Sequence, residues 1–249
     1  MSRLSPEHRA EIPGIIARQV RAGADPSLAC LHIPKTGGTS LANLIDAMRG
    51  RGMRAPLYLP HRIGLDEAVE FLPDSRLVVV LRDPLERMAS GFLSRLRKGR
   101  PRYDIPWTAR EEEAFANFPA PDAFFRALIS GDAEQVAAAR RAIRAIVHLR
   151  RGYASYFGSA GRVRAEAARF ALIGEIGAMR RIVEALAHLL GHDPAAVLSL
   201  YAADHVAPVG GGAALSALTD QERARLRKAF HAEYEVWEAL RALPGAQAA

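Results

Sequence analysis

The fold is decided by residues 28–48, LACLHIPKTGGTSLANLIDAM, where an apolar run leads into a loop that contains two glycines. The run over 28–33 is typical of a short buried strand, and Pro34 ends it because proline has no N–H for a ladder hydrogen bond. Gly37 and Gly38 follow, and apolar residues then recur at the spacing of one helix face. The segment therefore predicts a strand, a turn of the phosphate-loop type and a helix.

Three further strands are predicted along the chain. Residues 76–82, RLVVVLR, form a continuous run of the kind found in a central parallel strand with both faces covered. Shorter apolar runs over 57–59 and 170–174 predict the other two strands. Helical patterns occupy residues 39–48, 64–72, 84–97, 179–190, 194–203 and 219–240. Strands that alternate with helices predict an α/β fold with a central parallel sheet, here a three-layer, P-loop-like one.

The length of 249 residues, 49% of them hydrophobic, is sufficient for one large domain. We expect a single domain over residues 1–249, because no repeat, low-complexity tract or long linker interrupts the chain. From about 101 to 169 the sequence becomes helical and rich in arginine and glutamate. This segment is predicted to be a helical insertion over one end of the sheet.

The basic composition favours a small anionic ligand over nucleic acid. The formal net charge is +7, which is compatible with either kind of partner. Only Lys35, Lys98 and Lys228 are lysines, and the other basic residues are arginines. Such a bias is typical of a GC-rich genome rather than of selection for polyanion binding. We therefore expect no nucleic-acid partner.

The sequence also excludes several classes of protein. No apolar run approaches the roughly 18 residues that cross a bilayer. The N-terminal residues are charged and lack the apolar stretch of a signal peptide. We therefore expect no membrane span and a cytoplasmic location. Cys30 is the one cysteine, which excludes an intrachain disulfide framework and a multi-cysteine metal site.

The loop after the first predicted strand has the composition of an anion site. A helix N-terminus presents backbone N–H groups and a partial positive charge to an anion. Glycines allow the backbone to approach the ligand closely, and a lysine adds a full charge. The candidate binding residues are Lys35, Thr36, Gly37, Gly38, Thr39 and Ser40.

Two departures distinguish this loop from that of an ATP-binding protein. The Walker pattern has lysine immediately before the hydroxyl that binds Mg²⁺, whereas Lys35 lies four residues before Thr39. The strand over 76–82 ends in Arg82 rather than in a carboxylate for Mg²⁺. An arginine at the end of a neighbouring strand suits a second anion, so we expect a phosphate-bearing ligand and no metal.

The helix that follows Arg82 contributes one more candidate. Asp83 is expected to cap it, and Ser90 then falls on the same face as Asp83 by helical spacing. Open α/β sheets bind ligands at the carboxyl ends of their strands, where both anion sites are expected. A ligand with two separated phosphate groups would fill them.

HIPKTGGTSL over residues 32–41 and VVVLRDPLERMASGFLS over 78–94 resemble sulfotransferases that use 3′-phosphoadenosine 5′-phosphosulfate (PAPS). The resemblance is to the carbohydrate-type branch, sulfotransferase family 2, which includes heparan sulfate 2-O-sulfotransferases. It implies that residues 35–40 hold the 5′-phosphosulfate and that Arg82 and Ser90 hold the 3′-phosphate. It implies transfer of the sulfuryl group to a hydroxyl of a carbohydrate or small-molecule acceptor, leaving adenosine 3′,5′-bisphosphate.

Weaker resemblance covers residues 148–157 (HLRRGYASYF), 170–175 and the region of Tyr234. The helical insertion would then cover the acceptor side. In-line sulfuryl transfer depends mainly on positioning and charge stabilisation, in which Lys35 is the expected cation.

The family resemblance also implies a base for the acceptor hydroxyl. The 2-O branch has a histidine after its second strand, and His61 occupies that place after residues 57–59. An ordinary histidine pKa of roughly 6.5 suits a general base near neutrality. Other branches use a glutamate, so Glu67 and Glu70 stay candidates.

Two alternatives from other classes remain open at this point. A P-loop nucleotide or small-molecule kinase would depend on Mg²⁺-ATP, and a non-catalytic module would bind nucleotide without turnover. The basic run over 95–102, RLRKGRPR, is either a solvated helix end or an attractor for an acidic acceptor. The three glutamates over 111–113 are expected on a solvated helix face.

Overall fold

The computed structural model describes residues 4–101, 103–201 and 211–244 of the chain. The chain forms two compact units. The first consists of Met1–Arg82, Tyr153–His205 and Val236–Ala249, and the second of Asp83–Gly152 and Val206–Glu235. The chain is an α/β protein, as predicted, and its sheet lies in the first unit.

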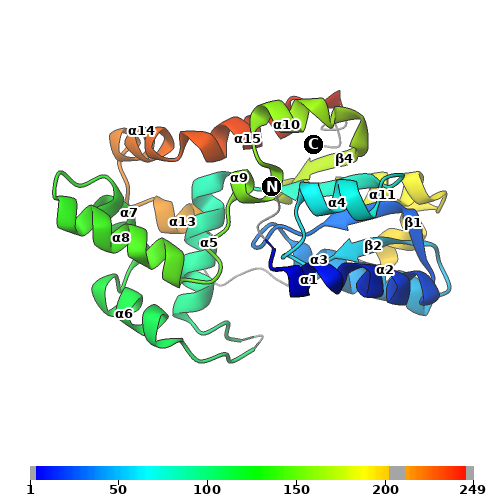
Figure 1. Cartoon of the computed structure of the whole chain (residues 1–249), viewed down its shortest axis with the longest axis horizontal. Coiled ribbons are helices and arrows are strands. Elements are labelled where there is room, and N and C mark those ends of the chain that lie inside the picture. The colour runs from blue at the N-terminus through cyan, green and yellow to red at the C-terminus, as the bar shows by residue number, and fades with distance from the viewer. Residues whose placement is uncertain (1–3, 102, 202–210, 245–249) are drawn as a thin grey trace. The chain divides into compact units, whose positions relative to one another are not determined.

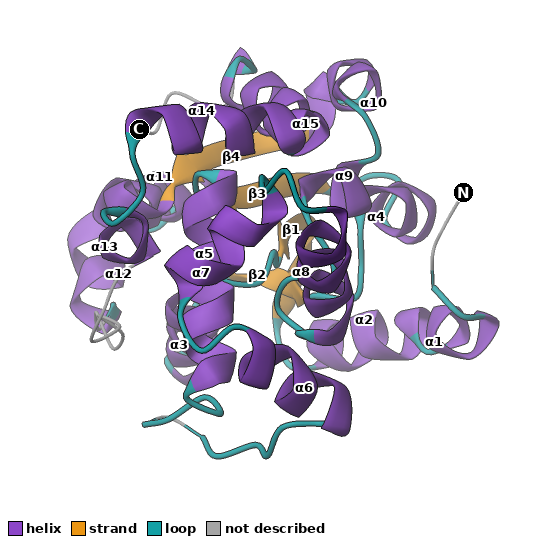
Figure 2. Ribbon diagram, turned by 90° about the vertical axis from the view of Figure 1, so that its left-hand side faces the viewer, coloured by secondary structure: helices purple, strands orange, loops and turns teal. Residues whose placement is uncertain are grey.

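The sheet has four parallel strands in the order β2-β1-β3-β4. Figure 2 shows them in this succession, from β4 to β2. The strands are β1 (Ala24–Leu31), β2 (Ala55–Leu59), β3 (Arg76–Leu81) and β4 (Phe170–Glu175). All four predicted strands are confirmed, with bounds that differ by a few residues.

Helices connect the strands and follow the last one (Figure 1). They are α3 (Gly38–Gly50), α4 (Leu65–Phe71), α9 (Tyr153–Phe157), α10 (Ala160–Ala165), α11 (Met179–Leu190) and α12 (Pro194–Leu200). Cys30, Val78 and Val80 pack in one core with α3, α11 and α12. The alternate residues Leu31 and Val79, which point to the opposite face, are also buried. The sheet is therefore covered on both faces, as its uninterrupted apolar strands predict.

Two N-terminal helices, α1 (Pro6–Ala10) and α2 (Ile12–Arg21), were not predicted. Helix α2 packs against β1 and β2. Gln19 accepts a hydrogen bond from the N–H of Tyr58 (2.8 Å) and donates one to its carbonyl (2.9 Å). Arg49 donates to the Gln19 amide oxygen (3.0 Å) and to the Pro56 carbonyl (2.9 Å). Side chains therefore complete the hydrogen bonds of β2 on the side away from β1.

The second unit is helical. Its helices are α5 (Pro84–Leu96), α6 (Ala109–Asn117), α7 (Pro121–Leu128), α8 (Ala133–Ala145), α13 (Gly211–Leu215) and α14 (Asp220–Ala229). Asp83 caps α5, as predicted, by accepting from the N–H groups of Leu85 (2.9 Å) and Glu86 (3.1 Å). The core of the second unit is filled by phenylalanine rings in stacked and edge-on contact, namely Phe92, Phe115, Phe118, Phe124 and Phe125. Of the predicted insertion, residues 153–169 belong to the first unit. That the two units form one domain stays a prediction.

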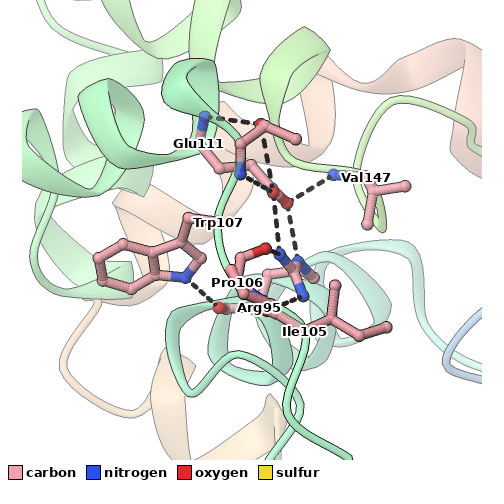
Figure 3. A network of polar contacts seen from close by, with 7 residues as sticks. Arg95, Ile105, Pro106, Trp107, Glu111 and Val147 are labelled. Carbon is pink, nitrogen blue, oxygen red and sulfur yellow. Dashed lines mark hydrogen bonds and ion pairs between the residues drawn. The ribbon is translucent and has the colours of Figure 1, made fainter.

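The charged runs of the second unit are not simple solvated faces. Arg95 and Glu111 form a buried bidentate ion pair with distances of 2.7 and 2.9 Å (Figure 3). Arg95 also donates to the carbonyls of Ile105 (3.3 Å) and Pro106 (3.2 Å), so it fixes the loop that follows α5. Burial acts to raise the pKa of Glu111, yet hydrogen bonds from Arg95 and from nearby backbone N–H groups lower it on balance. The expectation that Glu111 is solvated is wrong.

Other charges of the basic run also have partners within the second unit. Lys98 lies over the ring of Trp107 (4.8 Å), and Arg100 pairs with Asp104 (2.5 Å). Arg97 donates to the Arg100 carbonyl (3.4 Å). The run therefore stabilises its own loop, a role that neither interpretation of the sequence included.

The predicted final helix over 219–240 is two helices, α14 and α15 (His231–Arg241). Phe230 leaves the helical conformation with φ −108° and ψ 26°, and neither glycine nor proline marks the break. Tyr234 in α15 donates to both carboxylate oxygens of Asp83 (3.1 and 3.0 Å), and burial raises its pKa. The helix predicted over 194–203 ends at Leu200, and residues 202 and 203 lie outside the described part.

Candidate anion-binding and active site

The loop between β1 and α3 has the backbone of an anion cradle. Lys35 has φ 72° and Gly37 has φ 84°, so the chain twice adopts the left-handed conformation. The Thr36 hydroxyl is buried and donates to the Ile33 carbonyl (2.9 Å), which tightens the turn. Gly37 occupies the N-cap position of α3, and glycine has no side chain with which to cap the helix. The N-cap residue therefore leaves the first N–H groups of α3 uncovered, as an anion site requires.

The side chains of His32 and Tyr58 lie against Gly38. A β-carbon at this position would lie 2.0 Å from Nε2 of His32, so the imidazole fills the space that any other side chain needs. Tyr58 donates its hydroxyl to the Gly38 carbonyl (2.7 Å), and its ring lies 5.2 Å from that of His32. The first turn of α3 thus rests on His32 and Tyr58.

Arg82 lies directly after β3 and close to this loop. Its guanidinium Nη1 donates to the carbonyl of Lys35 at 3.5 Å. From β1 the chain continues to β2 at one edge of the sheet, and from β3 it continues to β4 at the opposite edge. The loops after β1 and β3 therefore diverge at the switch point, where open α/β sheets bind ligands.

The three candidate bases have different environments. His61 is exposed in the turn after β2, and its ring meets that of His32 edge to face at 5.4 Å. Glu67 is buried, and its carboxylate accepts from the N–H of Gly64 (2.7 Å) at the start of α4. Glu70 pairs with Arg9 of α1. Of these three residues, His61 is the one whose side chain adjoins the residues beneath the loop.

The charges at the site come from Lys35 and Arg82. Burial, with the neighbouring His61 and Lys35 charges, lowers the pKa of His32 to about 4, so its imidazole is neutral at pH 7. Burial raises the pKa of Cys30, so its thiol stays protonated. Neither group opposes or adds to the positive potential that an anion would meet.

The predicted site residues lie in both units. Lys35–Ser40 and Arg82 come together in the first unit, where Ser40 is buried and Thr39 is half-buried in the first turn of α3. Ser90 is buried in α5 of the second unit. Its part in the 3′-phosphate site stays a prediction.

Two tyrosines of α9 were missed by the sequence interpretation. Tyr153 accepts from the Arg82 N–H (2.9 Å) and donates to the Arg82 carbonyl (2.7 Å). Tyr156 donates to the carbonyl of His61 (2.5 Å). The segment over 148–157 carried a weak family resemblance, but the sequence gives no sign of which strand ends its tyrosines reach.

The described part of the chain has no group of three or more His, Cys, Asp or Glu residues that could hold a metal ion. None of its helices is long and apolar enough to cross a membrane. Two hollows of about 560 and 330 Å³ lie along α8 in the second unit, and neither contains a predicted site residue.

Comparison with known proteins assigns no family to this chain. No family model matches the sequence, and no curated protein or solved structure matches it.

Proposed function

We propose that this protein is a sulfotransferase that moves the sulfuryl group of PAPS to a hydroxyl of a carbohydrate or small-molecule acceptor. One observation carries the proposal, namely the contact between Arg82 and the Lys35 loop at the β1/β3 switch point. Two cationic residues on adjacent strand ends suit a nucleotide with one anionic group at each end of the ribose. The P-loop-like, three-layer character of the fold is part of this proposal.

The residues present fit such a donor. Lys35–Ser40 would hold the 5′-phosphosulfate at the start of α3, where the N-cap residue is Gly37. Arg82 would hold the 3′-phosphate, with Ser90 as a second donor. When bound, PAPS supplies an activated sulfuryl group for in-line transfer.

Lys35 and His61 have separate roles in this proposal. The ammonium of Lys35 would stabilise charge on the oxygen between the phosphate and the departing sulfuryl group. His61 would take the proton of the acceptor hydroxyl. Tyr156 and the capped start of α4 hold the backbone of the His61 loop. We favour His61 over Glu67 and Glu70 because its ring contacts that of His32 beneath the Lys35 loop.

A thermal-shift comparison of adenosine 3′,5′-bisphosphate with AMP, ADP and ATP tests the proposal. Ligands that bind the folded state raise its stability according to concentration and affinity. We expect the bisphosphate to raise the melting temperature most, with or without Mg²⁺. A larger shift with Mg²⁺-ATP would instead support a kinase.

Turnover distinguishes the proposed sulfotransferase from the second alternative, a non-catalytic nucleotide-binding module. Release of adenosine 3′,5′-bisphosphate from PAPS in the presence of hydroxyl acceptors is expected for a sulfotransferase. Tight binding of the bisphosphate without transfer to any carbohydrate or small-molecule acceptor would support a non-catalytic nucleotide-binding module.

A further inference from the structure

The five-residue helix α9 (Tyr153–Phe157) reaches two of the strand ends at the candidate site. Tyr153 bonds the backbone of Arg82 after β3, and Tyr156 bonds the carbonyl of His61 after β2. The helix also lies close to Gly64, where a β-carbon would be 2.9 Å from the Tyr156 carbonyl oxygen. One short helix therefore braces both turns.

We infer that Tyr153 is a positioning residue for the 3′-phosphate site, which it serves by fixing the backbone of Arg82. The inference rests on the proposed function, because it assigns Tyr153 a purpose only if Arg82 binds a phosphate. It adds to that function a residue that touches neither the nucleotide nor the acceptor.

The bonds of Tyr153 replace those of a neighbouring strand. The ladder between β3 and β4 ends at the Leu81 and Glu175 pair, so Arg82 is the next residue along. A single hydroxyl there accepts from the Arg82 N–H and donates to its carbonyl. Backbone polar groups that leave a sheet need such partners.

The hydroxyl is itself immobile because the ring that carries it is fully buried. Tyr153 has 0% exposed surface, and its ring is stacked on that of Phe157 at 6.4 Å. Phe157 in turn packs against Phe170 at the start of β4 (6.2 Å). A rigid support holds the Arg82 backbone, from which the guanidinium reaches the Lys35 carbonyl. Affinity is gained when a binding group is ordered before its ligand arrives.

Calorimetric titration of adenosine 3′,5′-bisphosphate and AMP tests the inference, since the two differ in the 3′-phosphate. Tyr153→Phe keeps the buried ring and removes only the hydroxyl. Because both hydrogen bonds to the Arg82 backbone are lost, we expect the variant to weaken bisphosphate binding by about tenfold and to leave AMP binding within about twofold. In an Arg82→Ala background, Tyr153→Phe should cause no further loss.

The matched variant is Tyr156→Phe, which removes a hydroxyl from the same helix but leaves the Arg82 backbone bonded. It should not reproduce the selective loss of bisphosphate affinity. A measurement that needs no variant is amide hydrogen exchange at Arg82, which should be slow in the wild-type protein.

Several results would overturn the inference alone. These are an unchanged bisphosphate affinity in Tyr153→Phe, an equal loss of bisphosphate and AMP binding, an undiminished effect in the Arg82→Ala background, or fast exchange of the Arg82 amide. A wild-type protein with no preference for the bisphosphate over AMP would instead overturn the proposed function, and the inference with it.

Discussion

His32 and Gly38 illustrate how much of this site depends on single residues. The imidazole of His32 lies where a β-carbon of residue 38 would be, and its ring also contacts those of Tyr58 and His61. Its position, rather than a bond to a ligand, shapes the loop that Lys35 occupies.

Gly38→Ala is expected to destabilise the protein by about 1–3 kcal/mol, as overpacking of a filled site does. The added methyl group would push His32 or the first turn of α3 out of place. Denaturant unfolding measures the loss. Gly14→Ala is the control, because a β-carbon there meets nothing within 4 Å and Gly14 is helical. It should raise stability by about 0.5–1 kcal/mol. Equal effects at both positions would contradict the packing argument.

The depressed pKa of His32 predicts a pH dependence of stability. Below its unfolded pKa of 6.5 the unfolded chain binds a proton at His32 that the folded chain, with a pKa of about 4, does not. Stability contributed by the neutral ring is therefore present above pH 6.5 and lost as the pH falls toward 4. The loss amounts to about 3 kcal/mol.

His32→Asn removes this titration and serves as the comparison. The variant should be less stable than the wild type at pH 7, and the difference should shrink between pH 6.5 and 4. Unfolding free energies at several pH values measure both curves. Parallel curves for the two proteins would show that His32 does not titrate as described.

Lys35→Ala and Arg82→Ala should affect nucleotide binding differently. Lys35 is assigned to the 5′ group, so its loss should weaken AMP and adenosine 3′,5′-bisphosphate alike. Arg82 is assigned to the 3′-phosphate, so its loss should weaken the bisphosphate alone. A charge-assisted contact contributes about 1.5–3 kcal/mol, which corresponds to a factor of roughly 10–150 in affinity. Equal losses for both nucleotides in Arg82→Ala would refute its assignment.

At the scale of elements, apolar patterns predicted the sheet well and the charged helices less well. The run over 76–82 predicted β3 correctly because an uninterrupted apolar run of this length is typical of a parallel strand buried on both faces. The break at Phe230 carries no glycine or proline, so periodicity could not reveal it. Glu111 looked solvated because its partner Arg95 lies 16 residues away and only packing brings them together. Helix α1 had a readable signal in its N-cap Ser5 followed by proline.

Breaking the Arg95 and Glu111 pair should be costly. Arg95→Met leaves a buried carboxylate without its cation and is expected to cost about 3–5 kcal/mol. Arg95→Met combined with Glu111→Leu should recover most of that loss, since both charges are then removed. Denaturant unfolding followed by tryptophan fluorescence is suitable, because Trp107 donates to the Arg95 carbonyl (2.6 Å). A single variant as stable as the wild type would contradict the role of the pair.

For the molecule as a whole, the residues of the candidate site were easier to predict from the sequence than the residues that hold them in place. The motif residues Lys35 and Arg82 could be placed together from the sequence, because parallel neighbouring strands end at the same edge. The contributions of Tyr153 and Tyr156 could not, since they lie about 70 and 95 residues along the chain from the groups they bind. Local patterns reveal which segments form elements, and only tertiary packing decides which side chains brace them.

The hydrogen bonds that Gln19 and Arg49 make to β2 have a consequence for how this protein behaves among its own copies. A sheet margin with open N–H and C=O groups recruits strands from other molecules and seeds aggregation. Here the Tyr58 N–H, the Tyr58 carbonyl and the Pro56 carbonyl are already engaged within the chain. Gln19→Ala should therefore scatter more light on mild heating than the wild type, whereas the exposed neighbour Arg18→Ala should not. The side-chain amide of Gln19 thus protects this edge strand from pairing with strands of other molecules.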